Sequence, residues 1–245
     1  MKFKRVKQIR SVGRLAGIDQ PFQSRAHAGW LLSELVAELD QPDAYVLAVS
    51  PGGIPVAAAI GERRWIPIDT VAVAAMLPAW PGAPPYGAIA FDGSAELDAG
   101  RIAEYGIARD ELAHAVRSEF RQAVERAERL RGDRPFADLG HRVAVIVDDG
   151  LTDPIALQVA IAAVKNAGAA WTVLALPTGR RHQVRKLSRE VDRIYCAHLS
   201  SDCHRPLAGS YENLEALSDG SLRELLDSLT VAAPRGVDGS TASTA

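Results

Sequence analysis

The sequence predicts an α/β fold in which a parallel sheet is flanked by helices. Four apolar segments are candidate strands, at residues 45–49, 68–73, 143–147 and 171–176, and helical patterns at residues 27–39 and 154–167 alternate with them. Two of the four candidate strands are apolar throughout. Continuous apolarity indicates burial on both faces, which is typical of parallel strands covered by helices on each side.

The segment between the second and third strands adds a helix and a loop. Residues 110–131 are charge-rich and helical in pattern, with Asp110 as the expected N-cap. One apolar stripe should cover the sheet, and it consists of Leu112, Val116, Phe120 and Val124. Residues 77–87 are rich in Pro and Gly and are predicted to form a loop. The sequence allows two interpretations of this loop. It is either a mobile flap or a fixed connection in which Trp80 and Tyr86 pack against the protein.

Composition limits the class of protein. The 245 residues are 47% hydrophobic and 24% charged, with a formal net charge of −2, the profile of an ordinary soluble globular protein rather than one that coats nucleic acid. No apolar run is long enough to span a membrane, and the N-terminus lacks the apolar core of a signal peptide, so we expect a cytoplasmic protein. We predict a basic N-terminal arm at residues 1–19, one domain at residues 20–228 and a disordered tail at residues 229–245.

A short stretch near the C-terminus raises the question of zinc. It contains Cys196, His198, Cys203 and His204, the first and third of which are the only cysteines of the chain. Their spacing does not match a standard zinc finger, and Cys196 follows Ile194 at strand spacing, which indicates a small core residue. We therefore predict no metal site here.

A candidate ligand site follows the strand at residues 143–147. Asp148, Asp149 and Gly150 come directly after the strand, and open α/β sheets bind ligands at the carboxyl ends of their parallel strands. A helix cap or a solvated turn is the alternative. Asp153 and Pro154 form a strong helix start, because the carboxylate can cap free N–H groups and proline at the first helical position gives up a donor that the helix does not use.

The same region resembles a known family. Residues 143–168 are similar to the ribose-phosphate motif of type I phosphoribosyltransferases, with a hydrophobic strand, two acids, a short loop and a helix. Residues 22–32, 50–57 and 211–219 are similar to the helical opening, the pyrophosphate loop and the C-terminal segment of a stand-alone bacterial branch, so the resemblance covers about residues 20–228. It implies a Rossmann-like parallel sheet with a small hood. It also implies a glycosyltransferase reaction of nucleotide metabolism, in which ribose 5-phosphate passes from phosphoribosyl pyrophosphate (PRPP) to a nucleobase or similar acceptor, with Mg²⁺ accompanying the pyrophosphate.

The resemblance also implies the residues that contact the ligand. They are Gly52 and Gly53 of the pyrophosphate loop, and Asp148, Asp149, Gly150, Leu151, Thr152 and Asp153 after the third strand. The paired acids would accept hydrogen bonds from the ribose hydroxyls, and the loop that follows would wrap the 5′-phosphate at a helix N-terminus. No residue is assigned as catalytic, because Thr152 stands where some members have an aspartate base, and threonine is not a base.

This chain departs from the family at three ligand positions. The phosphate loop reads Thr152-Asp153-Pro154-Ile155-Ala156, which lacks the family's glycine and one of its hydroxyls. The pyrophosphate loop, Ser50 to Gly53, lacks an arginine, and Ala74-Ala75 replaces an Arg-Lys pair. Each lost charged hydrogen bond removes about 1.5–3 kcal/mol. Arg180 and Arg181 are one candidate for compensation, and a solvated basic helix start is the alternative.

We therefore expect a degenerate relative with a pocket for a small phosphoribosyl- or nucleotide-type ligand, weak or inactive on PRPP. An active phosphoribosyltransferase is the alternative. Nucleic-acid binding through the basic arm is a third hypothesis that we do not favour, because no stacking aromatic residues accompany the charge. The acceptor base and the formation of a homo-oligomer are left open. We expect Asp149→Ala to disturb ligand binding more than folding, since an acidic residue at a strand end is not expected in the core.

Overall fold

The main sheet is parallel throughout. The computed structural model describes residues 9–11, 15, 18–49, 51–201 and 205–232, and in these residues six strands lie in the order β1-β9-β8-β7-β2-β3. The strands are β1 (Ile9–Arg10), β2 (Ala44–Val49), β3 (Ile68–Val71), β7 (Val143–Val147), β8 (Trp171–Arg180) and β9 (Arg193–Ser200). The predicted parallel α/β sheet is thus confirmed.

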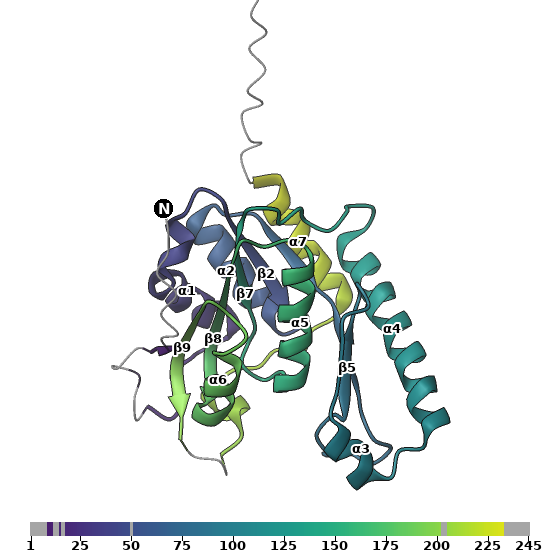
Figure 1. The fold of residues 1–245 in the computed structure, drawn as a ribbon. Coiled ribbons are helices and arrows are strands. Elements are labelled where there is room, and N and C mark those ends of the chain that lie inside the picture. Colours follow the sequence, from purple (N-terminus) through teal and green to yellow (C-terminus); the bar gives the residue numbers. More distant parts are fainter. Residues whose placement is uncertain (1–8, 12–14, 16–17, 50, 202–204, 233–245) are drawn as a thin grey trace, which may run out of the picture.

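Helices cover both faces of this sheet (Figure 1). One face packs against α1 (Arg25–Leu35), α2 (Gly53–Arg64) and α7 (Asp219–Ala232), and the other packs against α5 (Pro154–Asn166) and α6 (Arg181–Leu187). Successive strand residues point to opposite faces. In β7, Val143, Val145 and Val147 therefore enter the first core, whereas Ala144 and Ile146 enter the second. This double burial explains why β7 reads as an unbroken apolar run.

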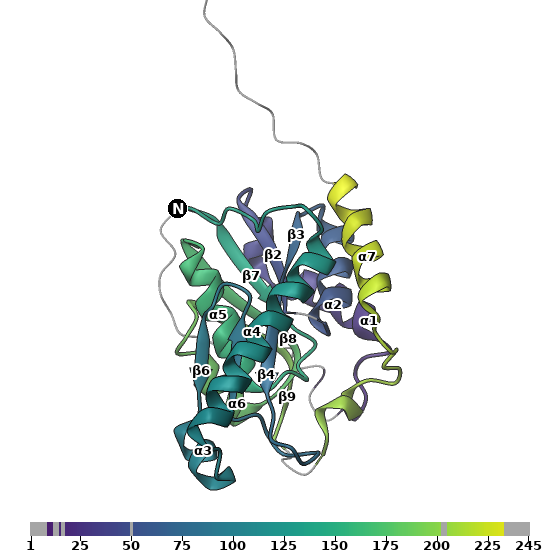
Figure 2. The same cartoon turned by 90° about the vertical axis from the view of Figure 1, so that its right-hand side faces the viewer.

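A smaller unit lies beside the main sheet (Figures 1 and 2). It is an antiparallel sheet of β4 (Val73–Met76), β5 (Gly87–Ala90) and β6 (Ala95–Leu97), followed by α3 (Ala99–Tyr105) and α4 (Arg109–Arg131). Helix α5 contacts β5 and β6 as well as the main sheet, and α4 covers β4 and β5. The N-terminus of α5 therefore lies where the two sheets meet.

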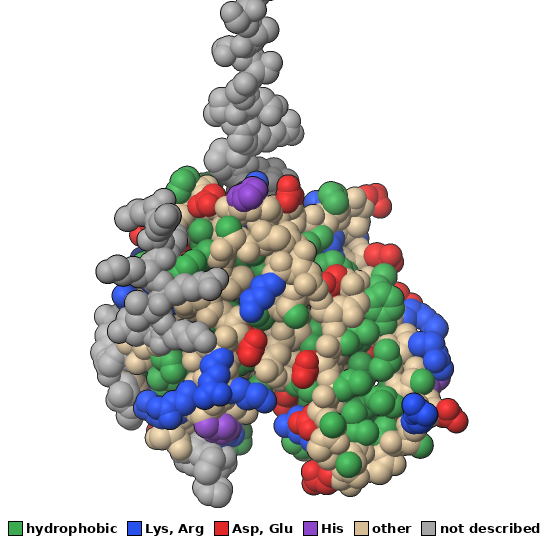
Figure 3. Space-filling view, viewed as in Figure 1, with side chains coloured by type: hydrophobic (Ala, Val, Ile, Leu, Met, Phe, Trp, Pro, Cys, Tyr) green, Lys and Arg blue, Asp and Glu red, His purple; other side chains and the backbone are tan. Residues whose placement is uncertain are grey.

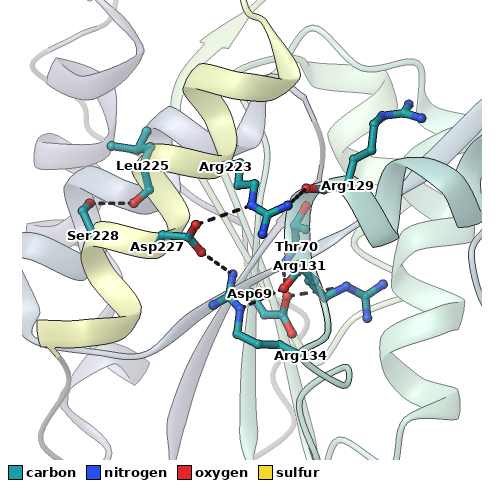
Figure 4. A network of polar contacts seen from close by, with 9 residues as sticks. All are labelled: Asp69, Thr70, Arg129, Arg131, Arg134, Arg223, Leu225, Asp227 and Ser228. Carbon is teal, nitrogen blue, oxygen red and sulfur yellow. Dashed lines mark hydrogen bonds and ion pairs between the residues drawn. The ribbon is translucent and has the colours of Figure 1, made fainter.

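A polar network attaches α4 to the main sheet and to α7 (Figure 4). At the end of α4, the buried Arg131 lies 3.9 Å from Asp69 of β3 and stacks on the ring of Phe91 at 4.3 Å. Arg134 pairs with Asp227 of α7 at 3.1 Å, and Arg223 of α7 donates to the carbonyl of Arg129. These contacts fix the C-terminal half of α4 relative to β3 and α7.

Several predicted elements differ in detail. Residues 68–73 divide between two sheets, because β3 ends at Val71 and β4 of the small sheet begins at Val73. The N-cap of α4 is Ala108, and Asp110 lies in the first turn instead. The predicted apolar stripe of α4 is only partly correct: Leu112 and Val116 pack against the small sheet, Phe120 is 38% exposed, and the buried positions lie further along.

The loop between β4 and β5 is largely a fixed connection. Tyr86 is buried, and Trp80 packs edge-to-face on Tyr105 with ring centroids 5.2 Å apart, although it stays half exposed. These contacts support the second of the two interpretations of residues 77–87, more strongly for Tyr86 than for Trp80.

The predicted boundaries at both ends need adjustment. Residues 9 and 10 belong to the sheet as β1, and Leu15 joins its core, so the arm cannot extend to residue 19. Helix α7 continues to Ala232, and Leu229 packs against the core, so the boundary after residue 228 falls inside a helix. Residues 1–8, 12–14, 16–17 and 233–245, which include most of the predicted arm and tail, lie outside the described residues. Within the part that is described, no helix has the length and apolarity needed to cross a bilayer.

Candidate functional site

Asp148 anchors the loop after β7. Its carboxylate is fully buried, with Oδ2 accepting a hydrogen bond from the N–H of Gly150 at 2.7 Å and Oδ1 accepting one from the Thr152 hydroxyl at 2.6 Å. Burial, reinforced by the neighbouring charge of Asp149, raises the pKa of Asp148 to about 7. Both carboxylate oxygens therefore already have donors from the protein.

Asp149 joins three parts of the chain. Its Oδ2 accepts from Nε of Arg25 in α1 at 2.8 Å, and its Oδ1 accepts from the N–H of Leu151 at 3.0 Å. Its backbone carbonyl accepts from the hydroxyl of Tyr211 at 2.5 Å. Asp149 is only 2% exposed, so the expectation that it would not sit in the core is wrong. Burial is tolerated because Arg25 balances the charge and the remaining oxygen has a donor.

Three glycines allow the backbone to pack closely around these acids. Gly150 has a φ of +84°, and a Cβ there would lie 2.2 Å from the carbonyl oxygen of Thr178. A Cβ on Gly52 would lie 2.3 Å from Oδ2 of Asp149, and one on Gly53 would lie 2.4 Å from the carbonyl oxygen of Val147. Because Gly52 and Gly53 have no side chains, the turn after β2 can pack closely against the loop that carries Asp148 and Asp149.

The predicted pyrophosphate loop is mostly helical. Helix α2 begins at Gly53, with Gly52 as its N-cap, so residues 53–57 are its first turns and only Pro51 and Gly52 form a described turn. Pro55 is tolerated because the first N–H groups of a helix have no partner within the helix. Ser50 lies outside the described residues.

Asp153 caps helix α5 as predicted. Its Oδ1 accepts from the N–H of Ile155 at 2.9 Å, and Pro154 is the first residue of the helix. Arg101 of α3 lies 3.9 Å from the same oxygen. The position at which a helix N-terminus would receive a phosphate is therefore occupied by the protein's own carboxylate.

A cleft of about 580 Å³ opens beside this cap, at the carboxyl ends of the strands. Its strand-side wall includes Pro51, Ala74, Ala75, Thr152 and Asp153, and its opposite wall is the polar face of α4 with Glu119, Gln122, Glu125, Arg126 and Arg129. The three positions at which the sequence departs from the family thus meet in one cavity. Asp148, Asp149, Gly52 and Gly53 lie behind this wall and are not among its lining residues.

Comparisons with known proteins found chains of similar sequence and fold. The chain is 27% identical over 206 residues to "Putative phosphoribosyl transferase Rv0571c" of Mycobacterium tuberculosis H37Rv and, equally, to "Putative phosphoribosyl transferase MT0597" of strain CDC 1551. The match covers 84% of this chain and 46% of each relative, so the chain spans about half the length of these curated relatives. The solved structure of TT1426 from Thermus thermophilus is 26% identical, with a TM-score of 0.68 over 84% of this chain and 98% of that one. No protein-family model matches the chain.

The chain is thus similar to proteins named putative phosphoribosyl transferases. Several contacts of this site were not predicted from single residues. Arg25 and Tyr211 lie in segments that were singled out for their resemblance, but no local pattern indicated that both would contact Asp149, from 124 and 62 residues away. Arg126 and Arg129 were missed because a charge-rich helix gives no sign of which charges face a cleft.

The two arginines that were candidates for replacing the missing cations lie outside the cleft. Arg180 ends β8 and donates to the carbonyl of Arg205, and Arg181 begins α6 as an exposed residue; neither lines the cleft. Figure 3 shows Lys and Arg side chains gathered over α6, away from α4. This position agrees with the solvated basic helix start.

The residues present do not fit a metal held by the protein. The two strand-end carboxylates, which could offer oxygen ligands, are engaged by Arg25, Thr152 and backbone N–H groups. Among the described residues, no group of three or more His, Cys, Asp and Glu side chains is placed to hold an ion. Cys196 is a buried strand residue, as predicted, with a pKa raised by burial to about 12, whereas Cys203 and His204 lie outside the described residues.

Proposed function

We propose that this chain binds a small phosphoribosyl- or nucleotide-type ligand in the strand-end cleft and is weak or inactive on PRPP. The observation that carries the proposal is the cap of α5. The carboxylate of Asp153 accepts a hydrogen bond from the N–H of Ile155, and Pro154, as the first residue of the helix, has no N–H to donate. A phosphate in the family's position would meet that carboxylate at about 5 Å, which costs about 3 kcal/mol per unit of like charge at an effective dielectric of 20.

The surroundings of the two acids that were expected to contact the ribose support the same conclusion. Asp148 and Asp149 are 0% and 2% exposed, and each already accepts two hydrogen bonds that hold the loop. Neither acid lines the cleft, so sugar hydroxyls could reach their remaining acceptor positions only if the loop opened. The two acids are therefore better suited to hold the loop than to bind a sugar.

One observation favours the alternative of an active phosphoribosyltransferase, a pentosyl glycosyltransferase. The cleft of about 580 Å³ lies at the strand ends and falls within the range of roughly 300–1,000 Å³ that is usual for small-molecule sites. If PRPP binds there with its phosphate away from Asp153, transfer to an acceptor remains open.

Calorimetric titration with Mg-PRPP tests the proposal. We expect a Kd of about 1 mM or weaker for the wild type. This corresponds to a binding free energy of about −4 kcal/mol or a less favourable value. Asp153→Asn should bind more tightly with little loss of stability, because asparagine is also a good N-cap but carries no charge. Replacing Thr152 to Ala156 with Ala-Thr-Gly-Ala-Thr should improve binding further, at some expense in helix stability.

The matched control is Asp110→Asn, which removes an acid from the first turn of α4 outside the cleft. Tight binding by the wild type, or an Asp153→Asn variant that behaves like Asp110→Asn, would show that Asp153 does not occupy the phosphate position. Release of pyrophosphate from PRPP in the presence of a mixture of nucleobases would support the active alternative.

A further inference from the structure

The two walls of the strand-end cleft carry different charges. The strand-side wall has no cation among its described residues: Pro51 stands where the resembling branch has arginine, and Ala74 and Ala75 stand where it has arginine and lysine. The cations of the described lining are Arg126 and Arg129, and both come from α4 on the opposite wall. Positive charge therefore enters this cavity from the small unit rather than from the main sheet.

Arg126 and Arg129 lie on the same face of α4 because they are three positions apart in the helix. Both are paired with Asp219 at the first turn of α7, at 3.6 Å for Nε of Arg126 and 2.9 Å for Nε of Arg129, and Arg129 also lies 3.9 Å from Glu125 of its own helix. Nε of Arg126 is buried and has no hydrogen-bond partner in the described structure. Asp219 is thus the counter-charge shared by both guanidinium groups, and Glu125 is a more distant, half-exposed partner of Arg129. The remaining N–H donors of the two groups can bind a further anion.

The arginines are held in position by the fold. The network at the end of α4 ties the backbone of Arg129 to Arg223 and places Arg131 beside Asp69 (Figure 4). Glu119, Glu125 and Asp153 also line the cleft, so its overall charge does not attract anions. An anionic ligand would be selected by local contacts with the two guanidinium groups, which suit the paired oxygens of a phosphate.

We propose that Arg126 and Arg129 bind the phosphate of a phosphorylated small molecule in this cleft, and that Asp219 competes with that phosphate for them. The proposal rests on the proposed function and adds the residues that select the ligand. The anionic end of the ligand then lies against α4, and its uncharged part faces Val73, Ala74 and Leu77 on the other wall. This orientation keeps the phosphate away from the Asp153 cap.

Titration with inorganic pyrophosphate and with ribose 5-phosphate at low salt tests this assignment. Arg126→Gln and Arg129→Gln should each weaken binding of both probes about tenfold, the effect of losing one charge-assisted hydrogen bond. Arg121→Gln is the matched control, since Arg121 is exposed on α4 and does not line the cleft; it should leave the affinity unchanged. Asp219→Asn should strengthen binding about three- to tenfold, because it frees both arginines.

The outcomes separate this inference from the proposed function. If the probes bind but the Arg126 and Arg129 variants match the wild type, or if Asp219→Asn fails to gain affinity, the inference is overturned and the ligand site itself stands. If pyrophosphate binds with the expected dependence on the arginines but ribose 5-phosphate does not bind, the inference holds and the proposed ligand class is wrong. If neither probe binds the wild type or Asp219→Asn, both are overturned. Melting temperatures of all variants show whether any of them simply fails to fold.

Discussion

Replacing Asp148 with asparagine should change how stability depends on pH. The pKa of the Asp148 carboxyl rises from 3.8 to about 7 in the folded protein because the group is buried and lies beside Asp149. Between about pH 4 and pH 7 the native state therefore keeps a proton that the unfolded chain has released. A native state that binds more protons loses stability as pH rises, and the loss is complete once pH exceeds the folded pKa.

The expected size follows from the shift. About 3 pKa units correspond to roughly 4 kcal/mol, which is an upper limit for the whole window. Between pH 5 and pH 8 the wild type should lose roughly 2–3 kcal/mol relative to Asp148→Asn. The variant has no titrating group at this position, and its side-chain carbonyl can still accept from the N–H of Gly150.

Urea unfolding of both proteins at pH 5, 6, 7 and 8 measures this difference directly. Burial also raises the pKa of Asp69 and of Glu119, but both groups are present in the two proteins and their effects cancel in the comparison. Parallel stability curves would refute the reasoning. They would mean that Asp148 is ionised at neutral pH and that Arg25 and the loop donors compensate both acids.

Three further changes test the role of the acidic loop and the chain end. Gly52→Ala should lower the free energy of unfolding by about 1–3 kcal/mol, because the new Cβ would lie 2.3 Å from the Asp149 carboxylate, whereas Gly220→Ala, with its nearest atom at 3.9 Å, should be neutral in the same urea experiment. Arg25→Gln should cost about 3 kcal/mol at pH 8 by leaving Asp149 buried without a counter-charge, and a neutral result would show that the ion pair is dispensable. Deleting residues 233–245 should leave the melting temperature unchanged, because the sequence APRGVDGSTASTA has little apolar surface to bury; a clear fall on truncation would contradict the predicted disordered tail.

Strand β7 was the clearest of the predicted strands, because each of its residues is apolar and buried. Val143 to Val147 alternates between two cores and so has no polar position. Strand β9 was not among the four predicted strands, because its sequence ends in polar residues and contains His198. The strand spacing of Ile194 and Cys196 was nevertheless recognised, and Ile194 to Ala197 are buried. Strand β8 was predicted to end at Leu176 but continues to Arg180. It tolerates Pro177 because β7 ends opposite Ala175 and leaves that side of β8 unpaired.

The candidate site was predictable where its chemistry is local. The capping of α5 by Asp153 depends on neighbouring residues only, and it was read correctly from Asp153 and Pro154. The partners of Asp149 come from distant segments, so the sequence could show an acidic pair but not its burial. Helix α2 was missed because the resemblance assigned residues 50–57 to a pyrophosphate loop, whereas the glycine and proline of this segment are compatible with the first turn of a helix.

The contacts of Asp149 also bear on the order in which the molecule folds. This residue closes a loop of 124 residues with Arg25 and one of 62 residues with Tyr211. Contacts that span long loops cost more chain entropy before they form, so they slow folding and tend to form after local structure. We therefore expect the acidic loop to reach its native contacts only after α1, β7 and the C-terminal segment have docked. Until that stage, two adjacent carboxylates remain exposed to water, where their charge opposes premature burial of the strand end.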